Sequence, residues 1–311
     1  MFVISWRNPG PEQADWDFDV YAAAVERVID VVREVSGSDD VNLLALCAGG
    51  ILTSTVLNHL AAGGDSRVRS ASFGVTLLDF SVQAPIGMFR TAPVLALARR
   101  KSRRTGVLDG SSLGAVFSWL RPNELVWNYW VNNYLMGKDP PRFDILAWNT
   151  DSTDLPAALH RQFLQIFERN VLAQPGELTV LDTPVDLRTI TVDTYVTGAT
   201  TDHLTPWRAC YETTQLFSGS STFVLSNAGH IASLINPPGN PKAHYFAGPE
   251  PVGGPDEWLG RADRQPGTWW DHWSTWIKDE DRSGAERRAP TKLGSRRHRP
   301  IEPAPGAYVR A

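Results

Sequence analysis

The sequence predicts the α/β class, with a parallel, doubly wound sheet, and three observations lead to this prediction. Short apolar, β-prone runs alternate with segments of helical periodicity at the start of the chain, and the same alternation returns near its end. Such an order of elements requires crossover connections, which are right-handed. The chain has 311 residues and is 42% hydrophobic, which is enough to bury a substantial core.

The first part of the predicted sheet consists of three strands and two helices. Each helix has apolar residues at helical spacing and is closed by glycine or serine, while each strand is a short apolar run. In chain order the predictions are a strand over 2–6, a helix over 21–35, a strand over 41–46, a helix over 49–62 and a strand over 70–78.

The alternation stops over 80–187, a stretch rich in tryptophan and proline. It contains two helix-like segments, 126–135 and 159–171, and we interpret it as a cap inserted in the sheet domain. The predicted organisation is therefore a first part of the core over 1–79, the cap over 80–187, a second part of the core over 188–278 and a charged, proline-rich tail over 279–311.

The second part of the core resumes the same pattern. A strand is predicted over 191–197, a helix over 209–217 and a last strand over 221–225. Four tryptophans then fall within two helical turns, which predicts a final helix packed on the core rather than a binding surface: Trp269, Trp270, Trp273 and Trp276.

Charge and cysteine content argue against several kinds of function. The net charge of −4 and the pI near 6.0 disfavour a polyanion partner, so nucleic-acid binding is not expected. The two cysteines, Cys47 and Cys210, are too few for a disulfide framework and have no metal-ligand spacing, so no metal is expected. No apolar stretch approaches the roughly 20 residues of a membrane span, and we expect a cytoplasmic protein.

Cys47 lies where this fold would place a nucleophile. It follows the strand 41–46 and precedes the helix 49–62, with Ala45 and Gly49 as the small residues that such a strand–turn–helix elbow needs. The Ala48 amide is the candidate oxyanion donor. Two alternatives are a buried structural thiol at this position and the serine motif over 110–114, which follows no buried strand.

The acid and the base follow in the order that an α/β-hydrolase-type sheet requires. Asp202 comes after the strand 191–197 and His230 after the strand 221–225, so both lie at carboxyl ends of strands, where ligands bind. We expect His230 to withdraw the Cys47 proton and Asp202 to orient the imidazolium. His203, adjacent to Asp202, is a further candidate for lining the site. Cysteine suits exchange between two thioesters, since that exchange is nearly balanced in free energy.

Several segments together resemble one family, the catalytic part of class I polyhydroxyalkanoate synthases. They are 3–9, the Cys47 box, 120–129, 143–149, Asp202-His203, 229–232, 235–238 and 301–306. The resemblance implies an acyltransferase that polymerises (R)-3-hydroxyacyl-CoA and releases CoA, with the growing chain on Cys47 and no cofactor. Trp148, within one of these segments, is a further candidate for lining the site.

The resemblance also implies an amino-terminal region that this sequence lacks. That region would include a strand lying in the sheet between the strands 2–6 and 41–46, and the loop that carries a second oxyanion donor. We therefore expect an N-terminally truncated sheet. The implied partners are the polyester chain or granule surface and a second copy or a full-length synthase. Two other functions stay open: a hydrolase using the same triad, and an inactive synthase-like chain that binds granules or pairs with a full-length synthase. The basic run 99–104 is either a contact for CoA phosphates or a solvated face.

Overall fold

The computed structural model describes all residues except 83–84, 121, 140–150, 280–291, 305 and 308–311. It divides the chain into two compact units. The first comprises Met1–Arg7, Asp19–Val82 and Asn170–Ala311, and the second Asn8–Phe18 and Gln83–Arg169. The predicted insert over 80–187 overlaps most of the second unit, but residues from Asn170 onward belong to the first, and its assignment as a cap stays a prediction.

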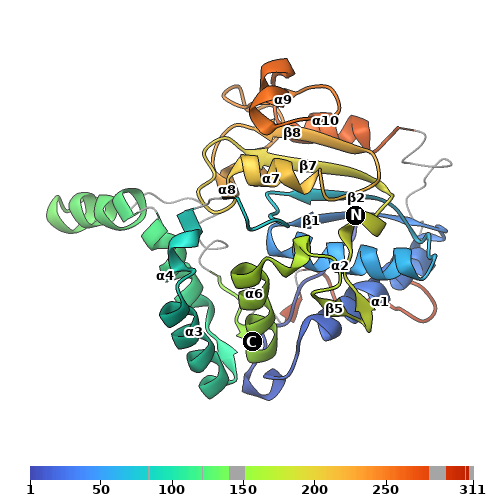
Figure 1. Ribbon diagram of the computed structural model, residues 1–311, viewed down its shortest axis with the longest axis horizontal. Helices are drawn as coiled ribbons and strands as arrows, with labels where there is room; N and C mark the ends of the chain where they lie inside the picture. Colours follow the sequence, from blue (N-terminus) through green and yellow to red (C-terminus); the bar gives the residue numbers. More distant parts are fainter. Residues whose placement is uncertain (83–84, 121, 140–150, 280–291, 305, 308–311) are drawn as a thin grey trace. The chain divides into compact units, whose positions relative to one another are not determined.

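The first unit is built on a six-stranded sheet in the order β1–β2–β7–β8–β9–β10. Figure 1 labels the first four of these strands, β1, β2, β7 and β8. The first four of these strands are parallel to one another, whereas β8–β9 and β9–β10 are antiparallel pairs. The strands are β1 Val41–Leu46, β2 Val68–Gly74, β7 Asp193–Ala199, β8 Ser221–Ser226, β9 His244–Ala247 and β10 Asp263–Pro266. This mostly parallel sheet with helices confirms the predicted fold class.

The helices of the first unit precede, connect and follow the strands of the sheet. They are α1 Phe18–Ser36, α2 Ala48–Ala62, α7 Trp207–Thr213, α8 His230–Ile235, α9 Pro255–Arg261 and α10 Trp269–Trp276, with the short 3-10 helices Val171–Ala173 and Leu187–Thr189 and the strand pair β5 Thr179–Val180 and β6 Thr183–Pro184. The structure confirms the predicted helices and strands from Tyr21 to the second part of the core within a few residues.

Both faces of the sheet are covered at β8, because successive side chains of a strand point to opposite faces. Phe223 packs edge-on against Tyr211 of α7 and Trp258 of α9. Its neighbour Val224 instead belongs to a buried cluster with Trp269 and Trp276 of α10. The tryptophan stripe is therefore part of the core, as its spacing predicted.

Each of the four tryptophans of α10 also donates a hydrogen bond from its indole nitrogen. The acceptors are the Ser233 and Leu234 carbonyls of α8, the Ser72 hydroxyl of β2 and the Thr222 hydroxyl of β8, at distances of 2.9 to 3.1 Å. Buried indoles normally find such a partner. These bonds attach α10 to α8 and to the sheet.

Two sheet predictions were wrong. Residues 2–6 form no strand, and most of their apolar side chains are exposed, with Phe2 at 48% and Val3 at 82%. A strand requires a partner for its backbone groups, and residues 2–6 pair with no described strand, so β1 ends the sheet with one edge unpaired among the described strands. Strand β8 is also not the last, because β9 and β10 follow it.

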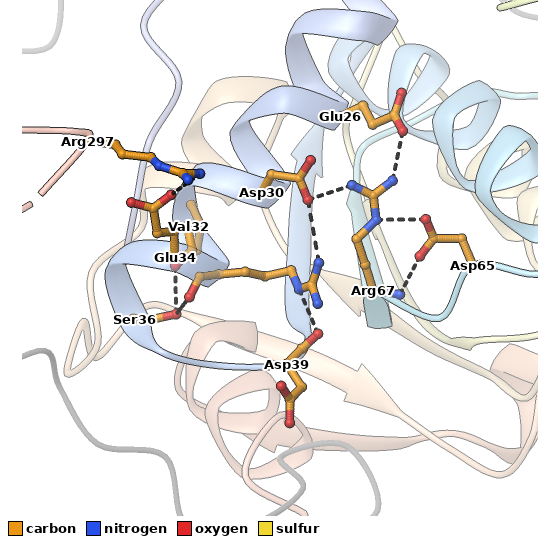
Figure 2. A network of polar contacts seen from close by, with 10 residues as sticks. Glu26, Asp30, Val32, Glu34, Ser36, Asp39, Asp65, Arg67 and Arg297 are labelled. Carbon is orange, nitrogen blue, oxygen red and sulfur yellow. Dashed lines mark hydrogen bonds and ion pairs between the residues drawn. The ribbon is translucent and has the colours of Figure 1, made fainter. Parts of the chain in front are cut away.

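An ion-pair network around Arg67 joins α1 to the beginning of β2 (Figure 2). The guanidinium contacts Glu26 and Asp30 of α1 at 2.7 and 2.6 Å and Asp65 at 2.7 Å. The Arg67 side chain is only 16% exposed. Part of the predicted tail also contacts α1, since the Ser295 hydroxyl donates to Glu34 at 2.6 Å.

The second unit is mainly helical. It contains α3 Ala92–Thr105, α4 Gly110–Leu120, two π-helical segments Asn123–Trp127 and Trp130–Leu135, α6 Ala157–Arg169, the 3-10 helices Pro11–Gln13 and Pro85–Phe89, and the strand pair β3 Val107–Leu108 and β4 Leu155–Pro156. The predicted helix 159–171 corresponds to α6, and the prediction over 126–135 corresponds to the π-helical segments.

Candidate active site

Cys47 occupies a strained turn between β1 and α2. Its φ of 50° and ψ of −121° lie in a backbone region that residues other than glycine rarely adopt. Hydrogen bonds on both sides fix the turn, since the Cys47 amide donates to the Gly74 carbonyl at 2.8 Å and the Gly50 amide to the Cys47 carbonyl at 2.9 Å. The structure thus forms the predicted elbow with a partly exposed thiol.

Gly50 is the position of this elbow that tolerates no side chain. A Cβ atom there would lie 2.3 Å from the Thr76 hydroxyl oxygen, whereas a Cβ at Gly49 would meet no described atom within 4 Å. The sequence analysis named Gly49 as a small residue of the elbow, and the structure adds that the close contact is at Gly50. The close neighbour is Thr76 of the loop after β2, and no sequence pattern indicated that it lies against α2.

Asp202 and His230 meet at the carboxyl ends of β7 and β8. The His230 Nδ1 atom lies 2.6 Å from the Asp202 Oδ2 atom, and the two residues are 7% and 8% exposed. Ala228, two residues before the histidine, has a φ of 80°. Strained backbone of this kind concentrates at functional sites, and it occurs here on both sides of the candidate pair, at Cys47 and Ala228.

The protonated form of His230 is stabilised despite its burial. Burial acts to lower the pKa of the imidazole, but the hydrogen bonds with Asp202 and Cys47 and the charges of those two groups raise it to about 10. Because Nδ1 is engaged by Asp202, Nε2 is the ring nitrogen available to Cys47. A base of this strength beside a thiol can take up and hold its proton.

Thr205 belongs to the same cluster, although it was not among the site residues predicted from the sequence. Its hydroxyl lies 2.7 Å from Asp202 Oδ2 and 3.2 Å from His230 Nδ1. The available signal was the spacing, because an aspartate commonly accepts hydrogen bonds from residues two and three positions ahead in a turn.

The structure gives the location of two further predicted site residues. Ala48 is the first residue of α2, where helix amides have no partner within the helix. His203 is half-buried in the loop after Asp202, and its role stays a prediction. Trp148 lies outside the described residues.

The serine motif over 110–114 and the basic run over 99–104 form polar contacts with neighbouring residues. The Ser112 hydroxyl of the alternative serine motif donates to Asp109 at 2.7 Å, at the beginning of α4. In the basic run on α3, Arg99 pairs with Glu168, and Lys101 pairs with Asp109 at 2.8 Å. In the part of the chain that the structure describes, no three acidic, histidine or cysteine side chains gather as a metal site would require.

Comparison with known proteins identifies the family. The model of the α/β hydrolase fold family matches residues 1–237. The chain belongs to the α/β hydrolase family. The elbow at Cys47 and the later aspartate and histidine have the chain order of this family, as the sequence predicted.

This α/β hydrolase is similar over nearly its whole length to polyester polymerases. It is 44% identical to poly(3-hydroxyalkanoate) polymerase 1 of Ectopseudomonas oleovorans over 99% of this chain and 55% of that protein, and 46% identical to polymerase 2 of the same organism over the same shares. It is 41% identical to the PhaC subunit of Cupriavidus necator over 100% of this chain and 54% of that protein. The chain spans about half the length of these curated relatives, and the predicted resemblance is confirmed.

Among the described residues, no helix combines the length and the apolar character that crossing a membrane requires.

Proposed function

We propose that this α/β hydrolase is an acyltransferase that polymerises (R)-3-hydroxyacyl-CoA through a thioester on Cys47. The observation that carries the proposal is the strained elbow, which presents a cysteine thiol to the buried His230–Asp202 pair. The printed names of the similar polymerases supply the substrate class. Without them, the same geometry would fit any acyl transfer.

The first half of the reaction loads Cys47. His230 accepts the thiol proton, and the Cys47 sulfur attacks the carbonyl carbon of the acyl-CoA thioester. The Ala48 amide donates to the oxygen that becomes negative. When the carbon–sulfur bond to CoA breaks, the proton held by His230 passes to the departing CoA sulfur, leaving an acylated Cys47.

The second half extends the chain. The 3-hydroxyl of another acyl-CoA gives its proton to His230, and its oxygen attacks the Cys47 thioester. The chain moves to that oxygen, and the Cys47 sulfur leaves and is reprotonated. The extended acyl-CoA then reacylates Cys47 and releases CoA. This cycle requires no cofactor, because CoA is the leaving group and protons move only through His230.

The partners in this proposal are the growing polyester or its granule surface, and a second copy or a full-length synthase. The location is the cytoplasm, at the granule surface when polymer is present. A hydrolase would use the same Cys47 thioester, with water in place of the 3-hydroxyl.

The test supplies (R)-3-hydroxybutyryl-CoA to the purified chain and measures released thiol, polymer and free acid. We expect thiol release with polymer, lost in Cys47→Ala and His230→Gln and retained in Ser112→Ala, which removes the competing serine. Thiol release with free acid alone would identify a hydrolase. A folded protein that releases no thiol would contradict both activities and favour the inactive granule-binding chain.

A further inference from the structure

The Asp202 carboxylate accepts hydrogen bonds from four donors in its buried turn. The Leu204 and Thr205 amides donate to Oδ1 at 2.8 and 2.9 Å. The Thr205 hydroxyl and His230 Nδ1 donate to Oδ2 at 2.7 and 2.6 Å. Since an ionised carboxylate offers about four lone-pair positions, its hydrogen-bonding capacity is filled, and Thr205 supplies two of the donors.

The hydroxyl of Thr205 also reaches the partner of this carboxylate. It lies 3.2 Å from His230 Nδ1, so it is within hydrogen-bonding distance of both members of the pair. Thr205 is 8% exposed. Water cannot easily replace a donor at this depth, and a missing donor would leave a buried acceptor unsatisfied.

The position of Thr205 is fixed from its other side. Pro206 follows it and restricts its backbone to extended conformations. Its carbonyl accepts a hydrogen bond from the buried Cys210 thiol of α7 at 3.5 Å. The hydroxyl is therefore held by the chain before the substrate arrives.

We propose that Thr205 is a positioning residue: its hydroxyl keeps the Asp202 carboxylate ionised and directed at His230 Nδ1, so that Nε2 is presented to Cys47. The catalytic consequence rests on the proposed function, but the geometry does not.

The electrostatics of Asp202 agree with this role. Burial acts to raise the pKa of Asp202, but the hydrogen bond and charge of His230 and both hydrogen bonds from Thr205 lower it below its ordinary value. Among the described residues, the thiols of Cys47 and Cys210 on neighbouring elements interact electrostatically with the pair.

The test follows the low-field proton resonance of His230 Nδ1–H by NMR while the pH is lowered, using Asp202→Asn to assign it. Loss of the resonance reports protonation of Asp202 and needs no substrate. We expect the resonance of Thr205→Val to disappear about one pH unit higher than that of the wild type, a tenfold change in proton affinity. Thr205→Ser, which keeps a hydroxyl, should match the wild type.

Identical loss in Thr205→Val and the wild type would overturn the proposal. If valine does not fit, Thr205→Ala removes the hydroxyl without adding volume and is judged by the same criterion. With active protein, we expect Thr205→Val to lower kcat about tenfold with KM unchanged and Thr205→Ser to restore it. An inactive wild type would contradict the proposed function, while the resonance would still decide the role of Thr205.

Discussion

The backbone of Cys47 places the thiol at the tip of a turn that only close packing can maintain. A cysteine at a φ of 50° is strained, and the turn holds this conformation because α2 lies against the loop after β2. Gly50 permits that approach, since a Cβ there would overlap the Thr76 side chain. The reactivity of Cys47 thus depends on a residue that carries no functional group.

Replacing Gly50 by alanine should therefore damage both the fold and the thiol. We expect Gly50→Ala to lower the free energy of unfolding by about 1 to 3 kcal/mol through overpacking and to slow alkylation of Cys47 by iodoacetamide. Gly49→Ala is the matched control, because its Cβ meets no described atom within 4 Å. A larger effect at position 49 than at position 50 would contradict this account of the elbow.

The raised pKa of His230 makes part of the folding stability depend on pH. The pKa is about 10 in the folded chain and about 6.5 for a free histidine. Its contribution is therefore fully present below about pH 6.5 and is lost as the pH rises through about 10. Urea unfolding should show the stability advantage of the wild type over His230→Gln falling by roughly 2 to 4 kcal/mol across this range. An advantage that does not change with pH would show that His230 is not held as an imidazolium.

At the scale of elements, helix α1 is attached to the sheet partly by charge. Arg67 contacts three carboxylates from α1 and from the turn before β2. Burying a charge is costly unless it is paired, and this guanidinium is mostly covered. Removing it would also leave the carboxylates Glu26, Asp30 and Asp65 close together without their shared cation.

Arg67→Gln should lower the free energy of unfolding by about 1 to 3 kcal/mol, and added salt should recover part of the loss by screening the carboxylates. The matched control is Arg188→Gln, which removes an arginine that is 68% exposed and paired with Asp186; we expect no measurable change. Equal midpoints for the two variants in urea unfolding would show that the Arg67 network contributes nothing.

Local patterns predicted the central elements and failed at the edges of the sheet. The central strands β2, β7 and β8 are buried along almost their whole length and contain few charged residues, so their sequence reports their burial. Strand β10 is Asp-Arg-Gln-Pro, and each of its four residues is exposed. An edge strand of this kind has no apolar pattern and tolerates proline. Residues 2–6 show the opposite error, since they are β-prone but pair with no described strand.

The same distinction applies to the site. The positions of Cys47, Asp202 and His230 were predictable because the order of strands along the chain places their loops at one edge of the sheet, while their catalytic roles stay proposals. Thr205 and the close approach of Gly50 to Thr76 were not, since both depend on contacts between loops that the sequence does not encode as a pattern. The roles of Ala48 and His203 stay predictions.

For the molecule as a whole, the parallel strands differ in how completely they are paired. Strand β7 lies between β2 and β8 and is buried along almost its whole length, while β1 has one neighbour among the described strands. Hydrogen exchange measured by mass spectrometry should therefore show the slowest amides in β7 and β8, with β1 exchanging at least about tenfold faster. Equal protection of β1 and β7 would mean that another segment covers the free edge in solution.

The four indole hydrogen bonds of α10 have a practical consequence for measurements on this protein. Two of them reach the Ser233 and Leu234 carbonyls of α8, the helix that begins with His230. Buried indoles emit at shorter wavelengths than hydrated ones, so release of α8 would expose Trp269 and Trp270 and move the fluorescence to the red. Intrinsic emission thus reports in part on the histidine helix, since Trp269 and Trp270 are two of the 12 tryptophans of the chain.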